Sequence, residues 1–248
     1  MIELNNIDVI YNKESQNEVH ALRSINLTVN KNDFLVLVGS NGSGKSTLLN
    51  VLAGTIKVNS GSIKIDNTDI TNLSDFEKSK FIARIFQNPL SGTSPDLTIL
   101  ENFRLAYLRT KPKNIRIGIN KDFADLVHDK IKLLGMNLET KLNQTMGSLS
   151  GGQRQALTLI MAIMDDCKIL LLDEPTAALD PKSSGLVLEK ANEIISENKL
   201  CAILVTHQMK EAIKYGNRII QLKEGKIVND LDVKQKETLT INELVDWF

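Results

Sequence analysis

The residues from Gly39 to Ser46 have the types and spacing of a loop that binds phosphate groups. They form the sequence Gly-Ser-Asn-Gly-Ser-Gly-Lys-Ser, which fits the pattern G-x-x-x-x-G-K-[ST]. Glycines let successive backbone N–H groups face an anion, and the N-terminus of a following helix adds positive potential. Lys45 is expected to reach the β- and γ-phosphates of a nucleotide, and the Ser46 hydroxyl to bind Mg²⁺. The alternative is a Gly/Ser-rich connection without a ligand, which this eight-residue pattern disfavours.

A pair of acids offers the complementary chemistry. Asp173 and Glu174 directly follow the apolar run Ile169–Leu172, which is typical of a buried strand. Beside a phosphate loop, Asp173 can bind Mg²⁺ or its water ligands, and Glu174 can polarise the attacking water. Acids that merely end a strand are the alternative for this pair taken alone. The two motifs together favour nucleotide hydrolysis.

The segment Leu149–Gln153, Leu-Ser-Gly-Gly-Gln, is a third candidate site. Ser150 and Gln153 have the spacing of a capping box, which would be a purely structural role. Two glycines in a first helical turn, however, cost roughly 1 kcal/mol each relative to alanine, so Gly151 and Gly152 indicate a close approach to something. A serine hydroxyl and bare N–H groups at a helix N-terminus can bind an anion. A chain with two phosphate-binding surfaces suggests that two copies enclose one nucleotide.

The elements that must position these residues follow an α/β pattern. Phe34–Val38 is a continuous apolar run before the phosphate loop, as expected for a strand covered on both faces. Residues 2–10 and 19–29 alternate at strand spacing and predict an antiparallel opening. Residues 88–148 are mostly helical in pattern and include a capping box at Thr98–Glu101. The α/β alternation returns afterwards, with strands expected at 169–172, 201–205, 218–222 and 226–228, helices at 181–197 and 209–215, and a short amphipathic helix at 240–248 that packs Trp247 and Phe248.

Composition excludes several classes of protein. The chain has 248 residues, 42% of them hydrophobic, which suits one large globular domain. Lysine plus arginine and aspartate plus glutamate both count 30, so the basic excess typical of nucleic-acid binding is absent. No apolar run reaches the roughly 18 residues of a membrane span, and the N-terminus does not have the pattern of a signal peptide. Cys167 and Cys201 adjoin apolar runs and are expected to be reduced and buried.

With these motifs in place, the sequence resembles the nucleotide-binding subunits of ATP-binding cassette (ABC) transporters along essentially its whole length. Residues 149–153 match the signature of that family. The resemblance implies a P-loop NTPase fold, with a RecA-like, mostly parallel core sheet, an antiparallel β subdomain and an inserted α-helical subdomain. It implies one domain over 1–248, with 1–87 and 149–248 forming the α/β core and β subdomain and 88–148 the helical subdomain.

The resemblance also implies roles for four further residues. Gln87 corresponds to the glutamine that contacts Mg²⁺ and the attacking water, and Asp180 to the D-loop aspartate. His207 corresponds to the switch histidine at the γ-phosphate, where it would orient Glu174 or water. Tyr11 corresponds to the aromatic residue that stacks on adenine. The complete expectation is as follows: Glu174, His207, Lys45 and Gln87 are catalytic; Ser46, Gln87 and Asp173 bind the metal; and Tyr11, Gly39, Ser40, Asn41, Gly42, Ser43, Gly44, Lys45, Ser46, Thr47, Ser150, Gly151, Gly152, Gln153 and Asp180 contact the nucleotide.

The function implied is that of an ATPase subunit with ATP and Mg²⁺ as cofactors. It would dimerise with a second copy on ATP binding and dock on integral membrane permease subunits at the cytoplasmic face of the cell membrane, with no nucleic acid as partner. Passages such as residues 92–99 and 177–182 resemble a bacterial subgroup with a branched-chain-amino-acid-type permease and a substrate-binding lipoprotein. This favours uptake of a small solute, for example tryptophan or tyrosine. The alternatives are a soluble cassette ATPase acting on ribosomes or DNA, and a P-loop small-molecule kinase.

Overall fold

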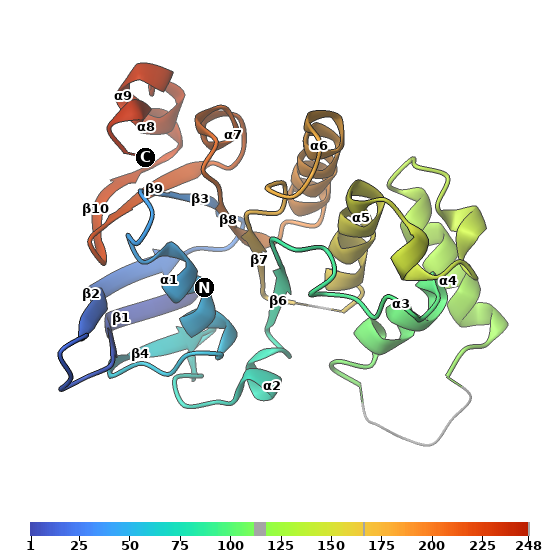
Figure 1. Cartoon of the computed structure of the whole chain (residues 1–248), viewed down its shortest axis with the longest axis horizontal. Helices are drawn as coiled ribbons and strands as arrows, with labels where there is room; N and C mark the ends of the chain where they lie inside the picture. The colour runs from blue at the N-terminus through green and yellow to red at the C-terminus, as the bar shows by residue number, and fades with distance from the viewer. Residues whose placement is uncertain (112–117, 166, 248) are drawn as a thin grey trace. The chain divides into compact units, whose positions relative to one another are not determined.

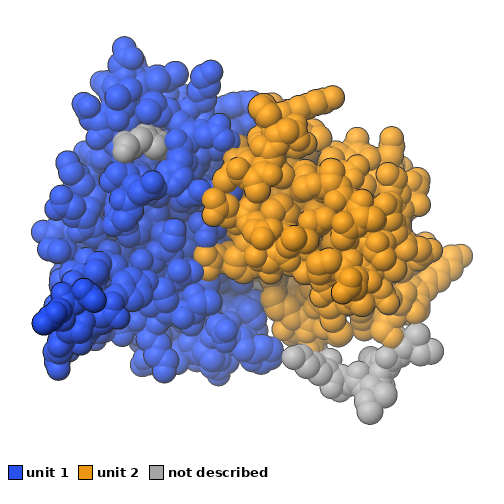
Figure 2. Space-filling model, viewed as in Figure 1, with its two compact units in different colours: residues 1–82, 168–174, 195–248 blue, residues 83–167, 175–194 orange. Residues whose placement is uncertain are grey.

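The computed structural model describes residues 1–111, 118–165 and 167–247. The chain divides into two compact units (Figure 2). Unit 1 comprises residues 1–82, 168–174 and 195–248, and unit 2 comprises residues 83–167 and 175–194. The expected helical segment 88–148 therefore lies within unit 2. This unit also contains residues 149–153, in its first segment, and Asp180, in its second segment. The predicted division into a core at 1–87 and 149–248 and a helical subdomain at 88–148 stays a prediction.

Unit 1 begins with an antiparallel sheet, as the alternating pattern predicts (Figure 1). Its strand order is β2-β1-β4-β5, formed by β1 (Ile2–Tyr11), β2 (Val19–Val29), β4 (Ser60–Ile65) and β5 (Thr68–Asp69). Alternate residues of β1, including Ile2 and Leu4, are buried in the main hydrophobic cluster. One face of the sheet therefore supports the core, and the other is polar.

The second sheet of unit 1 is mostly parallel and is built from apolar strands. β3 (Phe34–Val38) pairs in parallel with β8 (Cys201–Val205) and β9 (Arg218–Lys223), and β8 pairs in parallel with β7 (Ile169–Asp173). β10 (Lys226–Leu231) is antiparallel to β9. All five residues of β3 and of β8 are buried, which explains their continuous apolar sequences. The first residue of β6 (Ile82–Ile85) belongs to unit 1, and its other residues belong to unit 2.

Two helices of unit 1 lie between β3 and the end of its first segment in sequence. α1 (Lys45–Ala53) follows the phosphate loop, and α2 (Asp75–Lys78) has a capping box at Ser74 and Glu77. The Lys78 Nζ atom is buried and donates to the Val51 carbonyl oxygen at 3.1 Å, in the last turn of α1. The same carbonyl oxygen also accepts from the N–H of Gly54, the C-cap residue of α1, so α2 and the C-cap meet at one acceptor.

Unit 2 is predominantly helical, and its residues 88–148 include the helices that the sequence pattern predicts there. It contains α3 (Ile99–Tyr107), α4 (Lys121–Lys132) and α5 (Gly151–Ala162), and α6 (Pro181–Glu197) begins there. The predicted capping box at Thr98 and Glu101 is present. The buried Asn102 amide donates to the carbonyl oxygens of residues 94, 97 and 98, and so connects α3 to the loop before it. Buried backbone carbonyls thereby keep hydrogen-bond partners.

The C-terminal segment packs on the helix that follows β8. α7 (Met209–Lys214) and α9 (Ile241–Val245) share a cluster with buried Val36, Ala212 and Leu244. Trp247 is partly buried against this cluster, as predicted, whereas the expected packing of Phe248 lies outside the described residues. From α8 (Val233–Glu237), the buried Lys236 Nζ donates to the carbonyl oxygens of Tyr215 and Gly216. The end of α7 is therefore held by both apolar and polar contacts.

Lys236 makes the stability of the protein depend on pH in the alkaline range. Burial lowers its pKa from 10.5 to about 8, so between these values the unfolded chain binds a proton that the folded chain does not. The free-energy contribution of this group to folding therefore rises with pH across that window. From pH 8 to pH 10, we expect the unfolding free energy of the unchanged chain to rise by about 2 kcal/mol relative to that of Lys236→Met. Urea denaturation measures it; the exposed Lys234→Met is the control, and a pH-independent difference would contradict the assignment.

No helix within the described parts of the chain has both the length and the apolar character needed to cross a membrane. Cys167 and Cys201 are buried and are not joined in a disulfide, as expected. The Cys201 Sγ atom lies 3.1 Å from the Asn30 carbonyl oxygen. Burial raises the pKa of this thiol, which keeps it protonated and suits a packing role.

Candidate functional site

The phosphate loop joins β3 to α1 in unit 1, in the strand–loop–helix context that the motif requires. Lys45 is the first residue of α1, and its side chain is only 5% exposed. Its Nζ atom donates to the carbonyl oxygens of Gly39 at 2.6 Å and Ser40 at 2.9 Å. Burial lowers the pKa of Lys45, and the charge of Glu174 opposes that effect. The loop thus holds the lysine ammonium group at its centre.

Two glycines of the loop are needed for steric reasons. Gly39 has φ +145°, and a Cβ atom there would lie 2.2 Å from the Leu222 carbonyl oxygen. Gly44, the N-cap residue of α1, has φ +108°, and a Cβ atom would lie 2.7 Å from the Ala21 carbonyl oxygen. The left-handed conformation and the close backbone contacts both require glycine. The sequence pattern therefore reflects the packing of the loop against β2 and β9.

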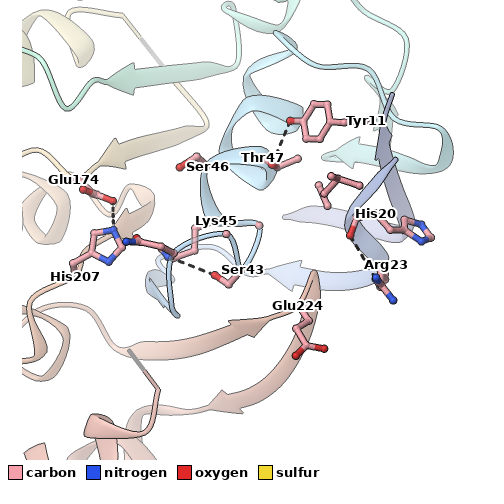
Figure 3. A pocket seen from close by; sticks show the side chains of 15 residues that line it. Tyr11, His20, Arg23, Ser43, Lys45, Ser46, Thr47, Glu174, His207 and Glu224 are labelled. Atoms are coloured by element: carbon pink, nitrogen blue, oxygen red, sulfur yellow. Dashed lines mark hydrogen bonds and ion pairs between the residues drawn. The ribbon is translucent and has the colours of Figure 1, made fainter. Parts of the chain in front are cut away.

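Glu174 and His207 form a close pair on one side of the loop, while Tyr11 lies on the other side (Figure 3). The His207 Nε2 atom lies 2.6 Å from the Glu174 Oε1 atom, and the exposed side-chain fractions are 39% and 17%. Parallel pairing of β7 with β8 causes this proximity, because the two residues follow the carboxyl ends of adjacent strands. Glu174 also has φ +46°, an uncommon conformation for a residue with a side chain. Its N–H donates to the Val205 carbonyl oxygen at 3.1 Å and so helps to hold that conformation.

A cavity of about 530 Å³ connects these residues. This volume lies within the range of small-molecule sites. Most of the expected catalytic and nucleotide-contacting residues of unit 1 line it: Tyr11, Asn41, Gly42, Ser43, Gly44, Lys45, Ser46, Thr47, Glu174 and His207. Gly39 and Ser40 contribute the carbonyl groups that bind Lys45. Asp173, the last residue of β7, directly precedes Glu174 but is not among the residues that line the cavity.

Tyr11 lines the cavity, and its hydroxyl lies 3.3 Å from the Thr47 Oγ1 atom on α1. The ring is partly buried against the main core cluster. This contact fixes the ring beside the first turn of α1. Stacking of this ring on a base stays a prediction.

Sequence reasoning missed five residues that line the same cavity: Val19, His20, Ala21, Arg23 and Glu224. They come from β2 and from the turn between β9 and β10. The Arg23 N–H donates to the Gly225 carbonyl oxygen at 2.8 Å, which brings the two segments together. No local motif marks this contact, since about 200 residues separate its partners in the sequence.

The remaining expected site residues belong to unit 2. Ser150 and Gln153 form the capping box at the start of α5. The Asp180 carboxylate accepts from the N–H groups of Lys182 and Ser183 at 3.1 Å each. Hydrogen bonding from Ser183, first from its side chain and then from its N–H, lowers the pKa of Asp180. Gln87 is exposed two residues beyond β6. Their participation in nucleotide binding stays a prediction.

The two glycines of the 149–153 segment have a packing role within unit 2. A Cβ atom on Gly152 would lie 2.6 Å from the Ser183 Cβ atom, and one on Gly151 would lie 3.2 Å from the Leu179 side chain. The close approach indicated by the sequence is therefore, at least in part, an approach to the segment 179–183 of the same chain. Ser150 is exposed at the helix N-terminus, whereas Gly152 is buried.

A smaller cavity of about 110 Å³ lies within unit 2, between the segment after β6 and the helices α3 and α5. Its lining includes Arg84, Phe86, Pro89, Arg109 and Gln155. The Gln155 Nε2 atom donates to the Phe86 carbonyl oxygen at 3.0 Å and so fixes the segment that leads to Gln87. We refer to the surface formed by these five residues as the arginine groove.

Comparison with known protein families places residues 22–177 in the family described as ABC transporter. Over 225 residues the chain is 40% identical to the tyrosine transport ATP-binding protein of Clostridioides difficile (strain R20291), covering 91% of this chain and 89% of that protein. It is 34% identical to a phosphonates import ATP-binding protein of Halalkalibacterium halodurans, covering 93% of this chain and 88% of that protein.

Solved structures agree with these similarities. A dimeric ATP-binding cassette in a post-hydrolysis state, bound to ADP and phosphate, superimposes with a TM-score of 0.80 at 28% identity and covers 94% of this chain and 99% of that chain. A dimeric bacterial ABC transporter cassette gives the same TM-score at 29% identity and the same coverage. The P-loop NTPase fold expected from the sequence is therefore confirmed.

Proposed function

The chain belongs to the ATP-binding proteins of the ABC transporter family, and from this premise we propose that it hydrolyses ATP to drive uptake of a small solute through a separate membrane permease. The observation that carries this proposal is the 2.6 Å contact between Glu174 and His207 at the edge of the cavity that Lys45 and its loop form. This arrangement places a candidate base and an orienting imidazole beside a phosphate-binding loop. Such a geometry serves hydrolysis of a nucleoside triphosphate.

Each residue near the loop has a distinct task in this proposal. Lys45 binds the β- and γ-phosphates, and its bonds to the Gly39 and Ser40 carbonyl oxygens keep its ammonium group within the loop. Glu174 accepts hydrogen bonds from the attacking water, and His207 keeps the Glu174 carboxylate oriented while it contacts the γ-phosphate. Catalysis then depends on positioning and on neutralising charge rather than on covalent chemistry.

The residues present also fit a magnesium ion. The described residues contain no group of three or more His, Cys, Asp or Glu side chains that could bind a metal alone. Mg²⁺ commonly uses one or two protein oxygens together with phosphate oxygens and water, which suits the Ser46 hydroxyl and the Asp173 carboxylate. Gln87 would supply a third protein oxygen. When bound, the ion neutralises developing charge on the β- and γ-phosphates.

We place a second copy of the chain over the nucleotide. Ser150 and Gly152 at the start of α5 would bind the γ-phosphate held by Lys45 of the other copy, with Asp180 lining the interface. The exposure of Ser150 supports this role, as does the existence of dimeric cassettes among the structures similar to this chain. Tyr11 would stack on the adenine base.

Unit 2 would contact the permease. Its arginine groove is concave and adjoins Gln87, so docking there would couple the permease to the residue expected at the metal. Leu90 follows the groove residue Pro89 and is 43% exposed, which gives this edge an apolar contact point. A permease contact here places the protein at the cytoplasmic face of the membrane.

An amino acid, with tyrosine or tryptophan as candidates, is the proposed solute. The name of the Clostridioides difficile relative, a tyrosine transport ATP-binding protein, supports this class. A substrate-binding lipoprotein would deliver the solute to the permease. The decisive experiment is copurification of the tagged chain from detergent-solubilised membranes, because recovery with ribosomes instead of a hydrophobic permease would favour the soluble ATPase alternative.

Leu90→Asp is expected to weaken permease copurification at least about tenfold while ATP affinity stays within about twofold, because a buried unpaired charge at an interface costs more than 1.4 kcal/mol. Quantitative mass spectrometry of the copurified permease measures the effect. Leu133→Asp at the C-cap of α4, where the parent side chain is 55% exposed, is the matched control. Equal permease recovery with both variants would contradict docking at this edge.

A further inference from the structure

The buried carboxylate of Glu211 has no task in the scheme above. Glu211 lies in the first turn of α7 and is only 8% exposed. Burial of a carboxylate costs free energy unless hydrogen bonds compensate, and apolar side chains would pack α7 against its cluster at lower cost. The neighbouring Ala212 does pack in this way. A polar residue at position 211 therefore indicates a specific contact.

That contact is with Thr206, the residue directly before His207. The Thr206 hydroxyl donates to the Glu211 Oε2 atom, and the same hydroxyl oxygen accepts from the Gln208 N–H at 3.0 Å. Thr206 is 2% exposed, so water does not compete for its hydroxyl. The residues on both sides of His207 are thus tied to Glu211 through one hydroxyl group.

On the N-terminal side of Thr206, the chain is also tied to Glu174. The Val205 carbonyl oxygen accepts from the Glu174 N–H at 3.1 Å, and the His207 Nε2 atom lies 2.6 Å from the Glu174 Oε1 atom. The histidine backbone is therefore held between a contact to Glu174 on one side and the Thr206–Glu211 contact on the other. All of these residues belong to unit 1.

α7 provides a fixed support for Glu211. Its far end is held by Lys236, which donates to the Tyr215 and Gly216 carbonyl oxygens, and its inner face packs through Ala212. A buried carboxylate on a helix that is held by such contacts can restrict the backbone that carries a neighbouring catalytic group. Figure 1 shows α7 directly after β8, with the C-terminal helices α8 and α9 beside it.

We propose that Thr206 and Glu211 are positioning residues that set the orientation of His207 toward Glu174. The proposal rests on the proposed ATPase function for its kinetic consequence, but the orientation itself can be observed without activity. Neither residue touches the cavity that the nucleotide would occupy, so both act through His207.

Thr206→Val tests the proposal, because it keeps the shape of the side chain and removes the hydroxyl. We expect kcat for ATP hydrolysis to fall about tenfold with KM for ATP within about twofold, since misorientation of a catalytic group affects the chemical step more than binding. Thr206→Ser keeps the hydroxyl and is expected to retain kcat. Thermal denaturation of both variants shows whether a fall in activity comes from loss of folded protein.

A double-mutant cycle separates positioning from general stabilisation. In a His207→Ala background, single-turnover assays with radiolabelled ATP are expected to show no further loss on adding Thr206→Val or Glu211→Gln, because the group that they position is absent. An equal fractional loss in both backgrounds would overturn the proposal. So would full activity of Thr206→Val in the unchanged background.

Nuclear magnetic resonance gives the readout that does not depend on ATP hydrolysis. The chain has three histidines, so the His207 ring signal can be assigned from a His207→Gln spectrum. We expect this signal to shift or broaden in Thr206→Val and to stay in place in Thr206→Ser. An unchanged signal in Thr206→Val would refute the positioning role even if the chain proved to have no ATPase activity.

Discussion

Glu174→Gln is expected to lower steady-state ATP hydrolysis by about 10²- to 10⁴-fold, the range that a general base contributes. The amide keeps the shape of the side chain but cannot accept a proton from the attacking water. ATP binding is expected to stay within about twofold, because Lys45 and the loop amides are unchanged. A coupled phosphate-release assay and an equilibrium nucleotide titration measure the two quantities.

The same variant should also accumulate dimers in the presence of ATP and Mg²⁺, because the step that reopens the proposed dimer is blocked. Size-exclusion chromatography with and without ATP detects this change. Glu224→Gln is the matched control, since Glu224 lines the same cavity but is not paired with His207. Near-normal turnover of Glu174→Gln would rule out Glu174 as the base.

Lys45→Ala, in contrast to Glu174→Gln, is expected to weaken ATP binding itself. Loss of a buried ammonium that is proposed to contact two phosphates should weaken ATP affinity about 10- to 100-fold, at about 1.5–3 kcal/mol for a hydrogen bond to a charged group. Turnover at any practical ATP concentration should then fall more than about 10³-fold, because the lysine also stabilises the transition state.

Isothermal titration with ATP checks this expectation. Lys226→Ala, at an exposed lysine on the strand after the Glu224 turn, is the control for loss of a positive charge. A Lys45→Ala chain that still bound ATP within twofold of the parent would contradict the phosphate-binding assignment. Together with Glu174→Gln, the variant distinguishes a defect in binding from a defect in chemistry.

Much of the fold could be predicted from local sequence signals, and each success has a physical cause. Phe34–Val38 and Cys201–Val205 are apolar throughout because both faces of these strands are covered, and both are fully buried. The helix boundary at Thr98 was predictable because its capping box satisfies N–H groups that the helix start leaves free. The bounds of individual elements shifted by a few residues, as at β10, which extends to Leu231.

The sequence by itself determined the phosphate loop, the acid pair and the family, because these depend on residue types at short, fixed spacings. It also led, through the family resemblance, to His207. Tertiary structure decided which of these groups meet: parallel pairing of β7 and β8 places Glu174 against His207, and the turn at Gly225 brings Glu224 to the cavity.

Two roles could be assigned only from the folded chain. Gly152 is required because a side chain there would collide with Ser183, and Glu211 is tied to Thr206 in a buried contact. Neither relation follows from a motif, since both depend on how a helix packs against a neighbouring segment. Local signals fix residue chemistry over a few positions, whereas the distances that turn those residues into a site are set by strand pairing and helix packing.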